Sequence, residues 1–320
     1  MLAKTQLNAS MMLAPTLLAP TKLNKTSTHN FALIACVLLA NGSLSCPASI
    51  QNHTFLSAQE WRDGLFLRFG QTPHQLPATC DGCHAPFSVL HGLECPNGGL
   101  IIRRHNTVRD TLGSIAAEND GSSAVRSEPQ LSTTSAPTLA PGHPMLTTPH
   151  PIADPHTPPP PPVLEENLKG DLSIEGFIES CTTSIIDVSI VSLDSKSYRD
   201  KKPLSALQGR EKAKLRKYQA ACESCRETFH PFIASADGML APEANAIIDR
   251  LATHMHECTQ RPLSETTNFV CIRIAFALVK ATHRCLRASH KLNYPSRAPQ
   301  SYAPPDPAEP PPEFRFHFPS

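Results

Sequence analysis

The segment Cys80-Asp81-Gly82-Cys83, followed by His91 and Cys95, most constrains how this chain can fold. Two cysteines separated by two residues, then a histidine and a third cysteine on a short return, form the ligand set of a Cys₃His zinc site. So short a loop has little core of its own, so bound zinc would supply its folding free energy, typically about 10–16 kcal/mol at neutral pH. We therefore predict a zinc knuckle at residues 78–98. The alternative is a disulfide-linked or reduced loop, and His84 and His105 are competing ligands better explained as solvated or facing phosphate.

Cysteine content bears on the compartment, because the chain has 11 cysteines. A reducing compartment, the nucleus or the cytoplasm, is favoured because the tightest cysteine cluster includes a histidine. Secretion is the alternative: Lys22 and Lys25 precede a short apolar run from Phe31 to Ala40, as in a signal peptide, and Asn41 and Asn52 would then be glycosylation acceptors. The run is too short to span a membrane. We expect no membrane partner.

Proline divides the chain into segments. The chain has 32 prolines, about twice the usual share, and many of them lie in residues 119–168 and 292–320. Such segments are extended and cannot bury a core, so we predict a disordered linker and a disordered tail. Pro158 to Pro162 could dock an SH3 or WW domain. The other predicted segments are a weakly structured N-terminal part (1–54), a unit of helix, zinc knuckle and basic helix (55–118), and an α/β domain (169–291).

Basic residues are concentrated locally, although the formal net charge is only +1. Local basic faces of this kind suit polyanions such as nucleic acids. One run extends from Arg199 to Lys217, and another follows the zinc-like loop on a polar helix predicted over Arg103 to Ala117. An earlier helix is expected at Ser57, which can form a capping box with Glu60. The residues expected to hold nucleic-acid phosphates are Arg103, Arg104, Arg109 and Lys212.

Residues 169–291 alternate between strand and helix patterns. Period-two alternation marks two strands, and longer amphipathic segments mark helices that follow them. This order predicts an α/β fold with one mixed sheet covered by helices. The predicted strands are 172–178, 185–191 and 232–235, and the predicted helices are 204–226, one starting at Pro242, and 264–289.

Acidic residues of this domain could form a second site. Asp171 begins the first strand, and Asp187 points away from the apolar face of the second, so antiparallel pairing could bring the two carboxylates together. On the next helix Glu211, Lys214 and Tyr218 share one arc. Such a set would suit a nuclease, in which carboxylates hold Mg²⁺ or Mn²⁺ and Lys214 positions water or stabilises the developing negative charge. Solvated salt bridges would explain the same spacing.

Several short stretches, spread over roughly 55–117 and 169–291, occur in a characteristic order. In sequence and order they resemble the region that follows the polymerase domain in reverse-transcriptase-like proteins of non-LTR retrotransposons. The matching residues are Trp61-Arg62-Asp63, Cys80-Asp81-Gly82-Cys83-His84-Ala85-Pro86-Phe87, His91-Gly92-Leu93-Glu94-Cys95 and Gly98-Gly99-Leu100-Ile101-Ile102-Arg103-Arg104-His105-Asn106, then Asp187-Val188-Ser189-Ile190-Val191, Glu211-Lys212, Lys217-Tyr218 and Leu286-Arg287.

The resemblance implies a nucleic-acid-binding Cys/His knuckle followed by a restriction-like endonuclease that nicks target DNA. Carried over to this sequence, it would make Asp171, Asp187, Lys214 or Lys217, and Tyr218 catalytic, with Cys80, Cys83, His91 and Cys95 as zinc ligands. Two departures stand out: Gly170 occupies the place of the family's proline, and no aromatic-x-Asp-Asp polymerase motif occurs in the sequence.

Three hypotheses follow. The first is a retrotransposon-derived, nucleic-acid-binding fragment with a Mg²⁺- or Mn²⁺-dependent DNA-nicking domain, which could be degenerate; DNA is its expected partner and RNA the alternative. The second is a non-enzymatic, zinc-dependent DNA- or RNA-binding or interaction protein. The third is a secreted protein linked by disulfides.

Overall fold

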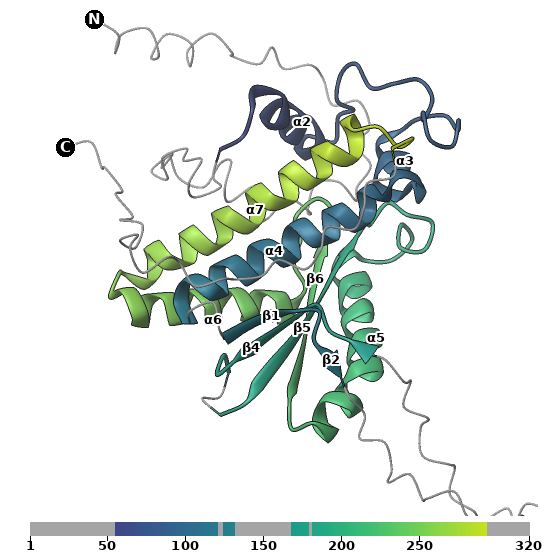
Figure 1. Cartoon of the computed structure of the whole chain (residues 1–320). Helices are drawn as coiled ribbons and strands as arrows, with labels where there is room; N and C mark the ends of the chain where they lie inside the picture. Colours follow the sequence, from purple (N-terminus) through teal and green to yellow (C-terminus); the bar gives the residue numbers. More distant parts are fainter. Residues whose placement is uncertain (1–54, 121–123, 132–167, 179–180, 293–320) are drawn as a thin grey trace, which may run out of the picture.

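The structure is a computed structural model that describes residues 55–120, 124–131, 168–178 and 181–292 (Figure 1). The expectations for residues 1–54, for Pro158–Pro162 and for the C-terminal tail concern positions outside these ranges. None of the described helices is both long enough and apolar enough to cross a membrane.

A four-stranded mixed sheet lies at the centre of the described chain (Figure 1). The second strand is antiparallel to the first and to the third, and the fourth strand is parallel to the third. A long helix, α5 (Pro203–Ser224), connects the two parallel strands. The predicted mixed α/β architecture is confirmed. In spatial order the strands are β1 (Val125–Ser127), β4 (Leu172–Glu175), β5 (Thr183–Val191) and β6 (Thr228–Ser235).

The predicted linker at 119–168 is too long. Strand β1 pairs with β4, with Val125 opposite Ile174, and β2 (Gln130–Leu131) pairs with β3 (Leu168–Lys169) in a separate two-stranded sheet. Strands of two or three residues are too short to produce a period-two pattern, so the composition of the surrounding segment misled the prediction. Residues 132–167 lie outside the described part of the chain.

Helices cover both faces of the sheet (Figure 1). The alternation of β5 decides which side chains each face receives: Ile186 and Val188 join the core beneath three helices, whereas Ile185 and Val191 pack toward α5. Asp187 has the same parity as Ile185 and therefore faces α5. The three helices on the first face are α4 (Leu100–Asp120), α6 (Pro242–Thr259) and α7 (Leu263–Arg287).

Helix α4 lies alongside α7 and joins the segment 55–118 to the α/β segment (Figure 1). Its side chains Val108, Leu112 and Ile115 belong to the same hydrophobic core as Ile274 and Leu278 of α7. One hydrophobic core therefore spans both predicted segments, and α4 is longer at both ends than the helix predicted over 103–117.

Helix α2 (Ala58–Arg68) begins as predicted, with Ser57 as its N-cap. The Glu60 N–H donates to Ser57 Oγ (3.2 Å) and the Ser57 N–H donates to Glu60 Oε2 (2.8 Å), which completes the capping box. The helix packs on α7, where a Cβ added at Gly64 would lie 3.3 Å from a methyl group of Val279. The close approach of these two helices therefore depends on a small residue in α2.

A buried ion-pair network fastens α2 to the end of α7. Asp63 accepts from Arg287 Nε (2.9 Å) and Nη2 (2.7 Å), and His283 Nδ1 lies 2.8 Å from Asp63 Oδ2. Arg287 also donates to the carbonyl oxygens of His74 and Gln75, which brings the chain after α2 onto the same helix end. Burial opposes ionisation of Asp63, but the hydrogen bonds from Arg287 and His283 outweigh it and lower the pKa of this carboxyl group.

Candidate functional site

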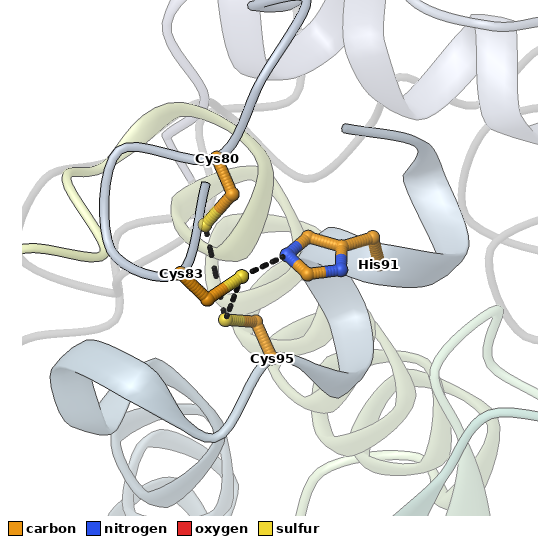
Figure 2. Close-up of side chains that lie close together, drawn as sticks. All are labelled: Cys80, Cys83, His91 and Cys95. Atoms are coloured by element: carbon orange, nitrogen blue, oxygen red, sulfur yellow. Dashed lines mark hydrogen bonds between the residues drawn. The ribbon is translucent and has the colours of Figure 1, made fainter. Parts of the chain in front are cut away.

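The four predicted zinc ligands converge on one point (Figure 2). Their ligand atoms all lie within 4.8 Å of one another. The Sγ of Cys95 is 3.8 Å from that of Cys80 and 3.9 Å from that of Cys83, and the Cys83 Sγ is 3.3 Å from His91 Nε2. Two sulfur atoms bound at about 2.3 Å to one tetrahedral zinc would lie about 3.8 Å apart. The cluster could therefore hold a zinc ion with little movement of its ligands.

Local backbone structure positions these ligands. The Cys80 N–H donates to Ala85 O (2.8 Å) and the Phe87 N–H donates to Ala78 O (2.9 Å), so the Cys-x-x-Cys turn sits at the tip of a small hairpin. The return is a short helix, α3 (Val89–Glu94), whose N-cap Ser88 accepts from the His91 N–H (3.1 Å). Cys95 is the C-cap of α3, so one helix supplies the last two ligands.

The thiols show why the cluster suits a cation. Burial opposes ionisation of Cys80, yet the backbone N–H groups of Cys83 and Gly82 and the His91 ring lower the pKa of Cys80 to about 6. At Cys95, burial and the neighbouring Cys80 and Cys83 sulfurs raise the pKa to about 11. Without a cation, a thiolate at one cysteine therefore disfavours deprotonation of the next cysteine. A bound divalent ion would reverse this effect and favour deprotonation of every ligand.

The loop packs on the C-terminal end of α7, so contacts with the rest of the chain add to the small core that the loop has of its own. Asp81 Oδ1 accepts from the His290 N–H (2.8 Å), and Asp81 Oδ2 accepts from the Ser289 hydroxyl (2.5 Å). Leu93 is buried in one small cluster with Cys285. The knuckle is therefore joined to the folded domain by packing as well as by the chain.

Substitution of Gly82 tests whether the loop packs closely against the chain after α7. A Cβ at this position would lie 2.4 Å from the carbonyl oxygen of His290, so we expect Gly82→Ala to shift backbone and to lower the free energy of unfolding by about 1–3 kcal/mol. The matched control is Gly209→Ala on α5, where an added Cβ meets nothing within 4 Å; there a gain of about 0.5–1 kcal/mol is expected. Urea unfolding of both variants measures the difference. Equal behaviour of the two variants would contradict the packing.

The two aspartates of the predicted carboxylate site lie where β4 and β5 pair. Leu172 is opposite Ile186 in the antiparallel register, which sets the preceding Asp171 opposite Asp187. The Val188 N–H donates to Asp171 Oδ2 (2.6 Å), and the Asp171 N–H donates to Ile186 O (3.1 Å). Pairing of the strands therefore brings the two aspartates together, as the sequence predicts for antiparallel neighbours.

Lys214 of α5 completes this group. Its Nζ lies 2.7 Å from Asp187 Oδ2. Burial is the largest cause that raises the pKa of Asp187, the charge of Asp171 raises it further, and Lys214 acts in the opposite direction. Because Asp187 is only 4% exposed, its negative charge is poorly solvated and one ammonium group compensates it only in part.

His105 is a member of this site that the sequence did not identify. It comes from α4, and its Nε2 lies 3.0 Å from Asp171 Oδ1. The sequence alone predicts that His105 is solvated or faces phosphate. Its spacing could have placed it, because Val108 and Leu112 follow at i+3 and i+7 and are both fully buried.

Other predicted catalytic residues have different surroundings. Glu211 accepts from the Glu243 N–H (2.9 Å) and so caps the first turn of α6; burial raises its pKa. Tyr218 is buried, and its ring stacks on Phe229 with centroids 4.9 Å apart. Lys217 Nζ lies 5.5 Å from the centre of the Tyr218 ring. Of the predicted catalytic set, Lys214 Nζ contacts Asp187 and also lies 5.3 Å from the centre of the Tyr218 ring, while Asp171 lies opposite Asp187 in the strand register.

Two of the three α4 arginines that were predicted to bind phosphate, Arg104 and Arg109, are buried instead. Arg104 is 3% exposed, with its Nη2 3.5 Å from Ile190 O. Arg109 is 2% exposed and pairs with Asp110 (2.9 Å) and Glu128 (3.0 Å). A guanidinium group enclosed in this way cannot reach a nucleic-acid backbone, so these two assignments are wrong. Of the other two predicted residues, Arg103 is half-buried and Lys212 is exposed on α5.

Comparison of the sequence with protein-family models and with curated proteins returned no match. The likeness to retrotransposon proteins therefore stays a prediction from the motifs.

Proposed function

We propose that this chain is a zinc-stabilised nucleic-acid-binding protein of retrotransposon origin that nicks DNA in a Mg²⁺- or Mn²⁺-dependent reaction. The observation that carries the proposal is the pairing of Asp171 with Asp187 across β4 and β5, with Lys214 2.7 Å from Asp187. The resemblance of the motifs to a restriction-like endonuclease supports the same assignment. It also accounts for the order of the two sites, a knuckle followed by a nuclease.

The donor set fits a hard divalent cation. Two carboxylates suffice, because Mg²⁺ usually keeps several waters and binds one or two carboxylates together with substrate phosphate oxygens. The raised pKa of Asp187, caused by burial and then by the charge of Asp171, indicates negative charge that is incompletely compensated. When bound, the ion would polarise a phosphoryl oxygen and lower the pKa of a coordinated water.

The protein's own groups have separate roles in the proposed hydrolysis. Water adds to phosphorus and one bridging P–O bond breaks, which leaves a hydroxyl on one product and a phosphate monoester on the other. Lys214 would stabilise the negative charge that develops on the phosphoryl oxygens. His105 and the Val188 N–H hold the two oxygens of Asp171, so they would fix the orientation of that carboxylate.

Supercoiled plasmid is the direct test. The full chain with Mg²⁺ or Mn²⁺ is expected to convert it to open circles, and Asp187→Asn is expected to lower that rate by at least about 100-fold. Asp249→Asn is the matched control, because Asp249 is exposed on α6; it should nick at the wild-type rate. Thermal unfolding of each variant shows that the fold is retained. Plasmid left supercoiled by the wild type, or nicked equally well by Asp187→Asn, would overturn the proposal.

One observation favours a second function, binding without cleavage. Both oxygens of Asp171 already have partners, His105 and the Val188 N–H, and Asp187 already pairs with Lys214. In this case the cluster of Asp171, His105, Asp187 and Lys214 only stabilises the fold, and the exposed basic residues of α5 hold nucleic acid. Salt-sensitive binding of DNA or RNA with no nicking under any divalent ion would select this function over the first.

A further inference from the structure

Arg210 and Lys214 lie one turn apart on α5 and both reach β5. Arg210 Nε donates to Ser189 Oγ (3.3 Å), and Lys214 Nζ lies 2.7 Å from Asp187 Oδ2. Asp187 and Ser189 are two residues apart on one strand, so their side chains emerge on the same face. The guanidinium group of Arg210 is therefore the next cationic group along β5 from the carboxylate site.

Most of the guanidinium of Arg210 is uncommitted. Its side chain is half-buried, and no carboxylate among the described residues pairs with it. Its terminal nitrogens Nη1 and Nη2 have no acceptor in that part of the chain, while Ser189 fixes its Nε. Arg109 and Arg287, by contrast, have acceptors at Nε, Nη1 and Nη2, namely carboxylates for Arg109 and a carboxylate with two backbone carbonyl oxygens for Arg287. A half-buried arginine that is oriented by a hydroxyl and still has both terminal nitrogens free is suited to bind an anion.

The spacing of the residues that position the two cationic groups indicates which anion they suit. Residues two apart on a strand are separated by about 6.8 Å, and residues four apart on a helix by about 6 Å. This is comparable to the distance between neighbouring phosphates on one nucleic-acid strand. We infer that Arg210 binds the phosphate adjacent to the one held at Asp187 and Lys214, so that the site requires a polynucleotide with consecutive phosphodiesters. The inference rests on the nucleic-acid-binding part of the proposed function.

The salt dependence of binding tests this subsite without requiring cleavage. Fluorescence anisotropy of a labelled DNA oligonucleotide, without divalent ions, would be measured over a range of NaCl concentrations. We expect Arg210→Gln to bind about tenfold more weakly and to lower the slope of log K against log salt by about 0.7–0.9, the value for one phosphate contact. Arg210→Lys keeps the charge and loses the two-pronged geometry, so it should retain the slope with reduced affinity.

Arg250→Gln is the matched control, because Arg250 is exposed on α6, which covers the opposite face of the sheet from α5. It should keep wild-type affinity and slope. An unchanged slope for Arg210→Gln, or an equal loss for Arg250→Gln, would overturn the inference. Thermal unfolding confirms that each variant is folded before binding is compared.

Plasmid nicking in parallel separates this inference from the proposed function. If the wild type nicks DNA and Arg210→Gln has the wild-type slope, the subsite is refuted and the nuclease stands. If the wild type never nicks and Arg210→Gln loses one phosphate contact, the nuclease is refuted and the subsite stands. Once the nick is mapped, a neutral methylphosphonate at the adjacent phosphate should weaken wild-type binding and leave Arg210→Gln unaffected; an equal loss in both proteins would overturn the subsite.

Discussion

Removal of metal from the Cys80, Cys83, His91 and Cys95 cluster is expected to unfold residues 78–98. Zinc bound by such a set supplies about 10–16 kcal/mol at neutral pH, which is comparable to the whole stability of an ordinary domain. Elemental analysis of the purified chain should return one zinc per molecule. A chelator that removes this zinc should lower the thermal unfolding midpoint, and added zinc should restore it.

Cys83→Ser is the variant that tests the ligand set. Cys83 is exposed, so its loss removes little packing and acts through the metal. Zinc content should fall well below one per molecule, and the unfolding midpoint should drop as it does with a chelator. Cys181→Ser is the control, because Cys181 is also an exposed free cysteine and lies far from the cluster in sequence; it should retain full zinc. A folded wild-type chain without stoichiometric transition metal would support the disulfide-linked or reduced alternative.

The effect of zinc should extend beyond the knuckle. Cys95 lies five positions before Leu100, where α4 begins. Helix α4 in turn places His105 in contact with Asp171. The knuckle also holds the end of α7 through Asp81. Loss of zinc would therefore loosen both helices next to the sheet. We expect DNA nicking to fall together with zinc content, since the carboxylate site depends on α4 for one of its contacts.

The sequence predicted best those features that depend on local periodicity. Alternation from Ile185 to Val191 identified β5 and the face of Asp187, and Ser57 with Glu60 fixed the start of α2. The Cys/His spacing likewise predicted all four members of the Cys/His cluster. In each case a few neighbouring residues determine the structure, so no knowledge of the tertiary fold was needed.

Features that depend on distant contacts were missed. Arg109 has the composition of a phosphate-binding residue, but Glu128 of the turn between β1 and β2 encloses it, and nothing local to the helix indicates that partner. His105 was missed for the same reason, because Asp171 is 66 positions away. Strand β1 exists because β4 pairs with it, and its three residues have no pattern of their own. The charge of a side chain indicates which ligands it could bind. Whether the side chain is exposed to such a ligand depends on contacts with distant parts of the chain.

Asp63→Asn is expected to destabilise the chain by about 3–5 kcal/mol, the usual cost of leaving a buried charge without its partner. Asp63 is 3% exposed and is the only carboxylate that the described structure pairs with Arg287. The substitution keeps the size of the side chain, so the loss comes from charge and hydrogen bonding. Urea unfolding at neutral pH measures it. Glu257→Gln, at an exposed position of α6, should stay within about 0.5 kcal/mol of the wild type.

The pH dependence of the stability difference between the wild type and Asp63→Asn provides an independent check. Burial opposes ionisation of Asp63, but Arg287 and His283 lower its pKa from the ordinary value of 3.8. A carboxyl group whose folded pKa is lowered stabilises the fold above its unfolded pKa, and this stability is lost as the pH falls through the folded pKa. The difference in unfolding free energy between wild type and Asp63→Asn should therefore be constant near neutral pH and shrink below about pH 3.8. A difference that stays constant at acid pH would show that Asp63 does not act through its charge, and α2 would then depend on packing alone.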